Sequence, residues 1–272
     1  MNADPSSRRR ITTSRDVLLL RIDKTRSMAI SCDAAGAIGS KLLDTIKADA
    51  TLVGQLTARV ALMELLAIGA NPVAISGTFS AEPKPTGESV IRGIKQEIRL
   101  GHLSKLKIVC SSEKNFKVKQ TGIGITAIGL VPNSMIKVGR CKHGDEIVAI
   151  GELSVGREVI QAEANRRIAD TLDVVKLRKS PWVHELIPVG SRGILYEAKV
   201  IAKDSGMSFE PSAPHPINLK KSAGPATVLL VAIRKGSFSG IRQILDRKRV
   251  RKVGTLQKRR IRSLAYRELL RP

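Results

Sequence analysis

The first 70 residues switch between two spacings of hydrophobic positions. Residues 16–22 and 27–32 are short apolar runs separated by a polar turn at 23–25, which predicts two strands. From 51 to 68 the apolar side chains recur every three or four residues, which predicts a helix. These side chains are Leu52, Leu56, Val60, Met63 and Ala67. Gly69-Ala70-Asn71-Pro72 is expected to end that helix.

The following segments continue the alternation of strands and helices. After the turn at 69–72, residues 72–80 predict a strand, 87–100 a second helix, and 105–110 and 121–131 two more strands. Turn-forming residues then occupy much of 132–145.

Beyond residue 145 the same alternation resumes. The segment 145–153 predicts a strand, 157–170 and 193–204 predict helices, 227–233 is a strongly apolar strand, and 237–247 predicts a last helix. We therefore expect an α+β fold of two mixed α/β domains, residues 16–135 and 136–246.

The formal charge of the 272 residues is +23, so its distribution matters. Residues 1–15 carry +3 and residues 247–272 carry +10, which predicts basic tails at both ends. The second tail has some helical pattern, at Ile261, Leu264, Ala265 and Leu269. Such tails could neutralise nucleic-acid phosphates, although four Phe, two Tyr and one Trp leave little for base stacking. The mildly basic middle suits small anionic substrates, so nucleic acid is the less favoured partner.

Cysteine usage and hydropathy indicate a cytoplasmic protein. Cys32, Cys110 and Cys141 lie far apart without a paired spacing, which argues against a disulfide framework or a zinc site. No apolar run approaches the ~20 residues of a membrane span, and no apolar stretch follows the N-terminal arginines as in a secretory signal.

Common phosphate-binding signatures are missing. The chain has no GxxxxGK[ST], no GxGxxG between a strand and a helix, and no protein-kinase motif set. Residues 36–41 (GAIGSK) look like half of a phosphate-binding loop without its other glycine, and Gly36, Gly39 and Lys41 are kept as candidate nucleotide-binding residues.

Four carboxylates lie at the ends of predicted apolar strands or inside the predicted apolar helix. Asp16 precedes one predicted strand, Asp33 follows the next, Glu64 lies inside the apolar helix, and Glu113 follows the strand at 105–110. Ionised carboxylates at such positions are costly unless they pair or bind a metal. If they converge, they form an oxygen-rich site for Mg²⁺ with nucleotide phosphates; otherwise each is an ordinary strand-end or salt-bridged residue.

The order of these motifs resembles the AIR-synthetase-like superfamily, which includes thiamine-monophosphate kinase. The matching features are the acidic Asp16, the strand ending in Asp33, Glu64 before the turn at 67–72, Glu113, and Gly144-Asp145-Glu146-Ile147. Within the superfamily, residues 15–245 most resemble the α-ribazole kinases of cobalamin salvage, through TARVALMELLAIGANP, SSEKNF, IPVGSRGILYEA and KSAGPAT.

This resemblance implies an ATP-dependent kinase that forms a homodimer, with the N-terminal sheets of two chains joined into a barrel. It implies that Asp16, Asp33, Glu64 and Glu113 hold Mg²⁺, with Asp33 and Glu64 also acting in catalysis. It also implies that Asp16, Glu113, Ser191, Arg192 and Gly193 contribute to ATP binding.

Two departures from the thiamine-phosphate kinases concern the substrate. Ser191-Arg192-Gly193 stands where those kinases have S-D-G, and Ala223-Gly224-Pro225 where they have an acidic G-E-D. With fewer carboxylates and an added cation, the site is expected to prefer neutral α-ribazole to thiamine phosphate, which carries a cationic thiazolium. The acceptor would then be the 5′-hydroxyl of α-ribazole. The alternatives are a thiamine-monophosphate-kinase-like enzyme, a ligase or cyclase of the same superfamily, an inactive relative, and a nucleic-acid-binding protein that uses the basic tails.

Overall fold

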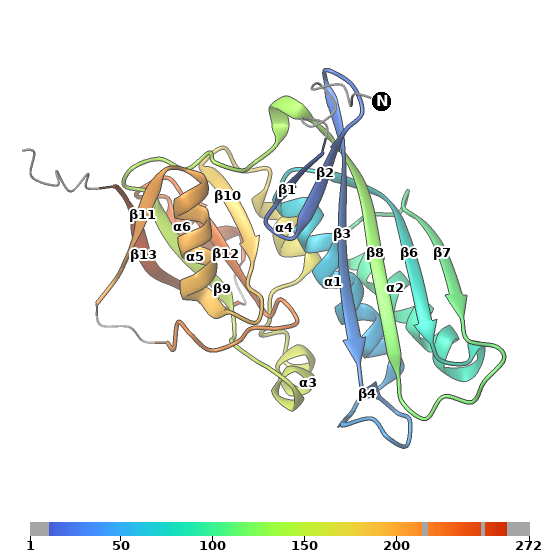
Figure 1. Cartoon of the computed structure of the whole chain (residues 1–272). Coiled ribbons are helices and arrows are strands. Elements are labelled where there is room, and N and C mark those ends of the chain that lie inside the picture. The colour runs from blue at the N-terminus through green and yellow to red at the C-terminus, as the bar shows by residue number, and fades with distance from the viewer. Residues whose placement is uncertain (1–10, 214–216, 246–247, 260–272) are drawn as a thin grey trace, which may run out of the picture.

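The computed structural model describes residues 11–213, 217–245 and 248–259, and these form a mixed α/β fold with two large sheets (Figure 1). The first sheet has the strand order β1-β2-β3-β8-β6-β7. Its strands are β1 (Ile11–Ser14), β2 (Val17–Arg21), β3 (Arg26–Gly36), β6 (Asn71–Ser80), β7 (Lys107–Ser112) and β8 (Gly122–Pro132). All neighbouring pairs are antiparallel except β6 and β7.

The second sheet has the order β10-β12-β9-β13-β11, and all its pairs are antiparallel. Its strands are β9 (Glu146–Gly151), β10 (Val183–Pro188), β11 (Met207–Pro211), β12 (Val228–Ile233) and β13 (Val250–Lys258). The short β4 (Ile38–Gly39) and β5 (Ile46–Lys47) pair with each other.

Helices α1 (Ala50–Ala67) and α2 (Glu88–Leu100) cover one face of the first sheet. Asp49 begins α1 by accepting a hydrogen bond from the Thr51 backbone N–H at 2.7 Å. The two helices pack closely because both have glycine at the crossing. A Cβ on Gly93 would lie 1.9 Å from the Thr51 carbonyl oxygen, and one on Gly54 would lie 2.4 Å from that of Val90.

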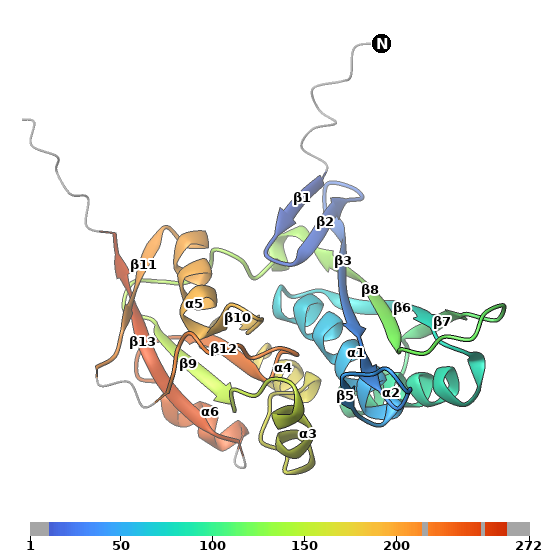
Figure 2. The ribbon, with the colours of Figure 1, turned by 60° about the horizontal axis from the view of Figure 1, so that its bottom comes forward.

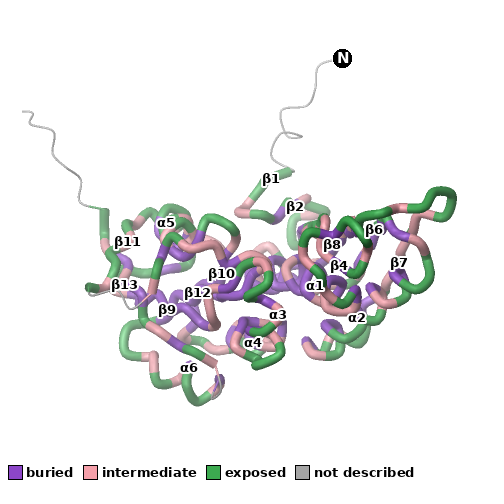
Figure 3. Tube along the Cα trace, turned by 90° about the horizontal axis from the view of Figure 1, so that it is seen from below, coloured by how far each residue is buried: buried purple, intermediate pink, exposed green. Residues whose placement is uncertain are grey.

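Helix α1 also belongs to the core of the second sheet. Its residues Met63, Leu66 and Ala67 pack with β9, β10 and β12, together with α4 (Thr171–Leu177) and α6 (Phe238–Ile244). Helix α5 (Gly193–Asp204) covers the opposite face of that sheet. Figure 2 shows α4 beside α1, and Figure 3 shows buried positions gathered around α1 between the sheets. By length and apolarity alone α1 could cross a membrane, but 78% of it is buried inside the fold.

Several expected elements have different bounds. Strand β3 continues to Gly36, so Asp33 lies within the strand rather than after it. The helix expected over 157–170 is instead α3 (Arg157–Ala164) followed by α4. The break has a local cause, because Asp170 caps α4 and forms a reciprocal capping box with Asp173. The last helix, expected to reach residue 247, ends at Ile244.

The two predicted tails are partly wrong. Residues 11–14 form β1, and Arg15 is buried in ion pairs with Glu185 and Asp204. At the other end, β13 lies between β9 and β11 and cannot be a solvated tail. Two cations from this end are neutralised within the fold: Lys248 contacts Asp170 and Asp173, and Lys252 contacts Glu146. The helical pattern from Ile261 to Leu269 lies outside the described residues.

Candidate functional site

A cluster of carboxylates forms where α1, the first sheet and α5 come together. Glu64 lies on α1 and is 7% exposed, Asp16 precedes β2, Asp33 lies on β3, and Glu197 lies on α5. The face alternation of β3 brings Asp33 to the α1 side of the sheet, the side of Ala29 and Ser31, where the Ser31 hydroxyl donates to the Ala61 carbonyl oxygen at 2.7 Å. Residues distant in sequence thus share one acidic region.

Burial raises the pKa values of Asp33 and Glu64, and neighbouring carboxylates raise that of Glu64 further. Burial, followed by the charges of Asp16, Glu197 and Asp33, raises the pKa of Glu64 well above its usual range, and Arg15 opposes this only in part. Burial raises the pKa of Asp33 to about 6, and the hydrogen bond from the Ala34 backbone N–H lowers it only in part. The cluster therefore holds more negative charge than its surroundings compensate.

Glu197 has the same kind of environment. Burial and the charge of Asp16 raise its pKa to about 7, while the Gly190 N–H, Arg15 and Arg192 lower it. Glu197 is not among the residues predicted from the sequence. Its position, one turn inside a helix that begins with Ser191-Arg192-Gly193, could have suggested it by the same reasoning that selected Glu64.

Arg15 is the second residue beside the cluster that the sequence did not predict. Its side chain is 4% exposed, pairs with Glu185, and donates to the Asp204 carboxylate at 3.0 Å and to the Leu186 carbonyl oxygen at 2.9 Å. These contacts attach the start of the first sheet to β10 and α5, and so hold a cation beside the cluster. Nothing in the sequence separates Arg15 from the other N-terminal arginines.

The segment Gly36–Lys41 does not form a phosphate loop in front of a helix. It leads into β4 and β5, and α1 begins only at Ala50. Gly39 is required by packing, since a Cβ there would lie 2.4 Å from the Thr121 hydroxyl oxygen. Lys41 pairs with Glu82. Of the three candidates in this segment, only Gly36 lies beside Asp33, at the wall of a cavity.

Ser191-Arg192-Gly193 opens α5 at the edge of the cluster. Gly193 has φ of +78°, and a Cβ there would lie 2.7 Å from the Lys221 carbonyl oxygen, so glycine is required. The Arg192 guanidinium lies 4.6 Å from the centre of the Tyr196 ring and lowers the pKa of Glu197. Arg192 is exposed, which leaves its charge free to meet a ligand phosphate.

Glu113 does not contribute to the charge that acts on this cluster. Its carboxylate accepts hydrogen bonds from the backbone N–H groups of Asn115 (2.7 Å) and Phe116 (3.2 Å) and so fixes the loop after β7. Glu113 is not among the groups that shift the pKa of Glu64 or of Asp33. Within one chain the structure thus brings together Asp16, Asp33 and Glu64, but not Glu113.

The donor chemistry of the cluster fits Mg²⁺, because carboxylate oxygens whose mutual repulsion is uncompensated are stabilised by a hard divalent cation. The present geometry is open, however. Within residues 11–213, 217–245 and 248–259, no three Asp, Glu, His or Cys side chains are close enough to hold a metal ion.

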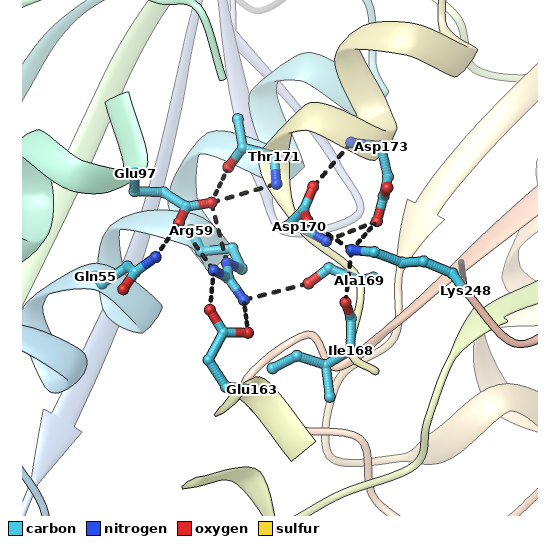
Figure 4. A network of polar contacts seen from close by, with 10 residues as sticks. All are labelled: Gln55, Arg59, Glu97, Glu163, Ile168, Ala169, Asp170, Thr171, Asp173 and Lys248. Atoms are coloured by element: carbon cyan, nitrogen blue, oxygen red, sulfur yellow. Dashed lines mark hydrogen bonds and ion pairs between the residues drawn. The ribbon is translucent and has the colours of Figure 1, made fainter. Parts of the chain in front are cut away.

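A buried ion network fixes α1 against its neighbours (Figure 4). Arg59 is fully buried and donates to Glu97 of α2 at 3.0 Å and to Glu163 of α3 at 2.7 and 2.8 Å. Glu97 also accepts the Thr171 hydroxyl of α4 at 2.6 Å. The helix that carries Glu64 is thereby held by three other helices.

Neither a protein-family model nor a curated protein matches the chain. Solved structures do resemble it. The thiamine-monophosphate kinase of Stenotrophomonas maltophilia K279a is 16% identical, with a TM-score of 0.61 over 93% of this chain and 90% of that one. The hydrogenase maturation protein HypE of E. coli is 16% identical, with a TM-score of 0.62 over 85% and 80%.

PurL of T. maritima, complexed with AMPPCP, is also 16% identical, with a TM-score of 0.62 over 93% of this chain and 43% of that one. These proteins share the AIR-synthetase-like fold. The resemblance expected from the sequence is therefore confirmed at the level of the fold, and this chain has the AIR-synthetase-like fold.

Proposed function

We propose that this chain is an ATP-dependent kinase that transfers the γ-phosphoryl group to a hydroxyl of a small molecule. The observation that carries the proposal is the cluster of Asp16, Asp33, Glu64 and Glu197, in which burial and the charges of the other three carboxylates raise the pKa of Glu64. Such a cluster gains stability by binding a metal–nucleotide. The resemblance to structures with bound ATP analogues, among them AaThiL complexed with AMPPCP and TMP, supports nucleotide use.

Asp33 is the proposed general base. With a pKa near 6 it is mostly ionised at neutral pH, yet basic enough to accept a proton from a hydroxyl. The substrate oxygen bonds to the γ-phosphorus, the bond from that phosphorus to the ADP oxygen breaks, and the hydroxyl proton moves to Asp33. Arg192 binds phosphate oxygens from the edge of the cluster.

Asp16 and Glu64 are the proposed Mg²⁺ ligands, and the bound ion would neutralise charge on the phosphates. Buried Glu64 would hold such an ion in a fixed place, because α1 is held by the Arg59 network. Glu113, Ser191 and Gly193 remain proposed nucleotide-binding residues on the sequence resemblance alone.

We further propose that the substrate is α-ribazole, phosphorylated at its 5′-hydroxyl, in the cytoplasm. The sequence blocks shared with the α-ribazole kinases support this choice, together with Arg192 and the neutral Gly224 and Pro225 near Asp33. Steady-state assays with α-ribazole and thiamine phosphate test it. We expect kcat/KM to be higher for α-ribazole; a higher value for thiamine phosphate favours the thiamine-monophosphate-kinase-like alternative.

The proposed quaternary structure is a homodimer in which the first sheets of two chains form a barrel. Leu18, Ile30 and Val109 lie on the face of this sheet opposite α1 and α2, with Leu18 38% and Val109 66% exposed. A second chain would bury this apolar face. In this proposal the sheets are the centres of two domains, with the boundary near residue 135 and the second domain extended through β13.

A further inference from the structure

Besides the acidic cluster, Asp33 borders a cavity of about 460 Å³. The cavity lies between the end of β3, the β4–β5 segment, the first half of α1, the start of α3 and the turn at Gly224-Pro225. Its walls are mainly aliphatic, and the larger side chains are Ile38, Ile46, Leu52, Leu56, Val159 and Ile160. This volume lies within the range of small-molecule sites, roughly 300–1,000 Å³.

The polar groups of the wall are few. Thr57 donates its hydroxyl hydrogen to the Val53 carbonyl oxygen at 2.8 Å. Among the residues that the structure describes, Asp33 is the only ionisable one that lines the cavity, and none of their Lys, Arg or His side chains does so. An anionic ligand would therefore lose its hydration without gaining a cation and would face the Asp33 carboxylate. A ligand with an N–H or O–H donor would satisfy that carboxylate.

Small residues shape the remaining wall. Ala34, Ala35, Gly36, Ala48, Gly156 and Gly224 let the backbone approach a ligand, which leaves a narrow space bounded by aliphatic side chains. The wall formed by α1 and α3 is held in place because Val159 packs with Leu56, and because Glu163, one turn further along α3, pairs with Arg59 of α1 (Figure 4). A pocket with fixed walls suits a rigid ligand, because little conformational freedom is lost on binding.

We propose that this cavity binds the aromatic heterocycle of an uncharged ligand, whose N–H or O–H donates to Asp33. This inference rests on the proposed function in one respect: the heterocycle is taken to belong to the phosphoryl acceptor. Asp33 then lies between the ring site and the acidic cluster, where it can meet the acceptor hydroxyl. Ile46 from β5 and Ile160 from α3 set the size of ring that fits.

Benzimidazole and its matched anion, benzimidazole-5-carboxylate, are the probes. Calorimetric titration of the full chain without nucleotide should show benzimidazole binding at least tenfold more tightly than the carboxylate. Equal affinity for the two, or no binding of benzimidazole, overturns the proposal. In Asp33→Asn the preference for the uncharged probe should shrink, because the repelling charge is gone.

Two filling variants locate the site. Ile46 and Ile160 are partly exposed and belong to different elements, so each position can accept a larger side chain. Ile46→Trp and Ile160→Trp should each weaken benzimidazole binding at least tenfold. Met135→Trp, exposed and outside the cavity, is the matched control and should bind as the wild type does. Thermal melts identify any variant that fails to fold. Undiminished binding in both folded Trp variants overturns the proposal.

The same variants separate this inference from the proposed kinase activity. If benzimidazole binds in the cavity but no hydroxyl substrate is phosphorylated, the kinase proposal fails and the ring site stands. If both folded Trp variants phosphorylate α-ribazole with unchanged KM, the ring site fails and the kinase proposal stands.

Discussion

Glu64 shows how one residue serves binding at the expense of stability. A carboxylate that is 7% exposed among Asp16, Asp33 and Glu197 costs folding free energy whenever it is ionised. A helix position used only for packing would carry a residue such as leucine there. The placement becomes useful if a divalent cation with its nucleotide compensates the charge.

The first prediction concerns Glu64→Gln, which keeps the shape and removes the charge. The variant should unfold at a higher temperature than the wild type, because the repulsion within the cluster is reduced. It should bind Mg²⁺–ATP at least tenfold more weakly by calorimetry. Unchanged Mg²⁺–ATP affinity would remove Glu64 from the proposed metal ligands.

The second prediction concerns pH. The pKa of Glu197 is about 7 in the fold and near 4.5 in the unfolded chain, so between these values the folded state binds more protons. The contribution of Glu197 to the free energy of unfolding is therefore fully present below pH 4.5 and is lost as pH rises through 7. Glu197→Gln should remove this loss. Since Glu197 is only half-buried, the gain relative to wild type at pH 8 should be roughly 1–2 kcal/mol. Urea melts at pH 5 and pH 8 measure it, and an equal effect at both values would contradict the assignment.

At the scale of elements, the Arg59 network makes four helices depend on one side chain. Arg59→Ala leaves Glu97 buried without its cation, which typically costs about 3–5 kcal/mol. The matched control is Arg26→Ala, which breaks an exposed pair with Asp23 and should leave the urea midpoint unchanged within error. Similar melts for the two variants would show that the network does not hold the helices.

Strand β13 corrects the domain boundary expected from charge. A chain shortened after residue 249 removes β13, which leaves β9 with an open edge and β11 without a partner strand, so it should be insoluble or unfolded. A chain shortened after residue 259 keeps all described strands and should melt as the full chain does. Circular dichroism on the two shortened chains checks this, and cooperative melting of the shorter one would refute the role of β13.

These elements show where sequence patterns are informative. The helix expected over 193–204 coincides with α5, and α1 differs from its prediction by one residue at each end, because packing on one stripe sets a clear period. Strand β13 was missed because strands β9 and β11 on either side of it are distant in sequence, and its many cations resemble a solvated tail. Among the site residues, Asp16 and Asp33 lie close enough to Glu64 to raise its pKa, whereas Glu113, which was expected beside Asp33 and Glu64, fixes the loop after β7. Arg15 and Glu197 owe their places to contacts between the sheets, which no local pattern reports.

At the scale of the whole molecule, α1 is the element that both cores share. Leu62 and Leu65 pack with the first sheet, whereas Met63 and Leu66 pack with the second. Both faces of the second sheet are covered by helices. The first sheet is covered on one face only among the described elements, and this asymmetry leads to the last prediction.

The uncovered face of the first sheet should be the contact between two chains. Ile30 lies at its centre, paired with Leu18 on β2 and Ile128 on β8. Light scattering at micromolar concentration should give twice the 29.5 kDa of one chain for the wild type. Ile30→Glu places a charge into that contact, where desolvation without a partner is costly, and should give a folded monomer. Met135→Glu, at an exposed position beyond the end of β8, should stay dimeric. A monomeric wild type, or a dimer that persists in Ile30→Glu, would show that this face does not join two chains.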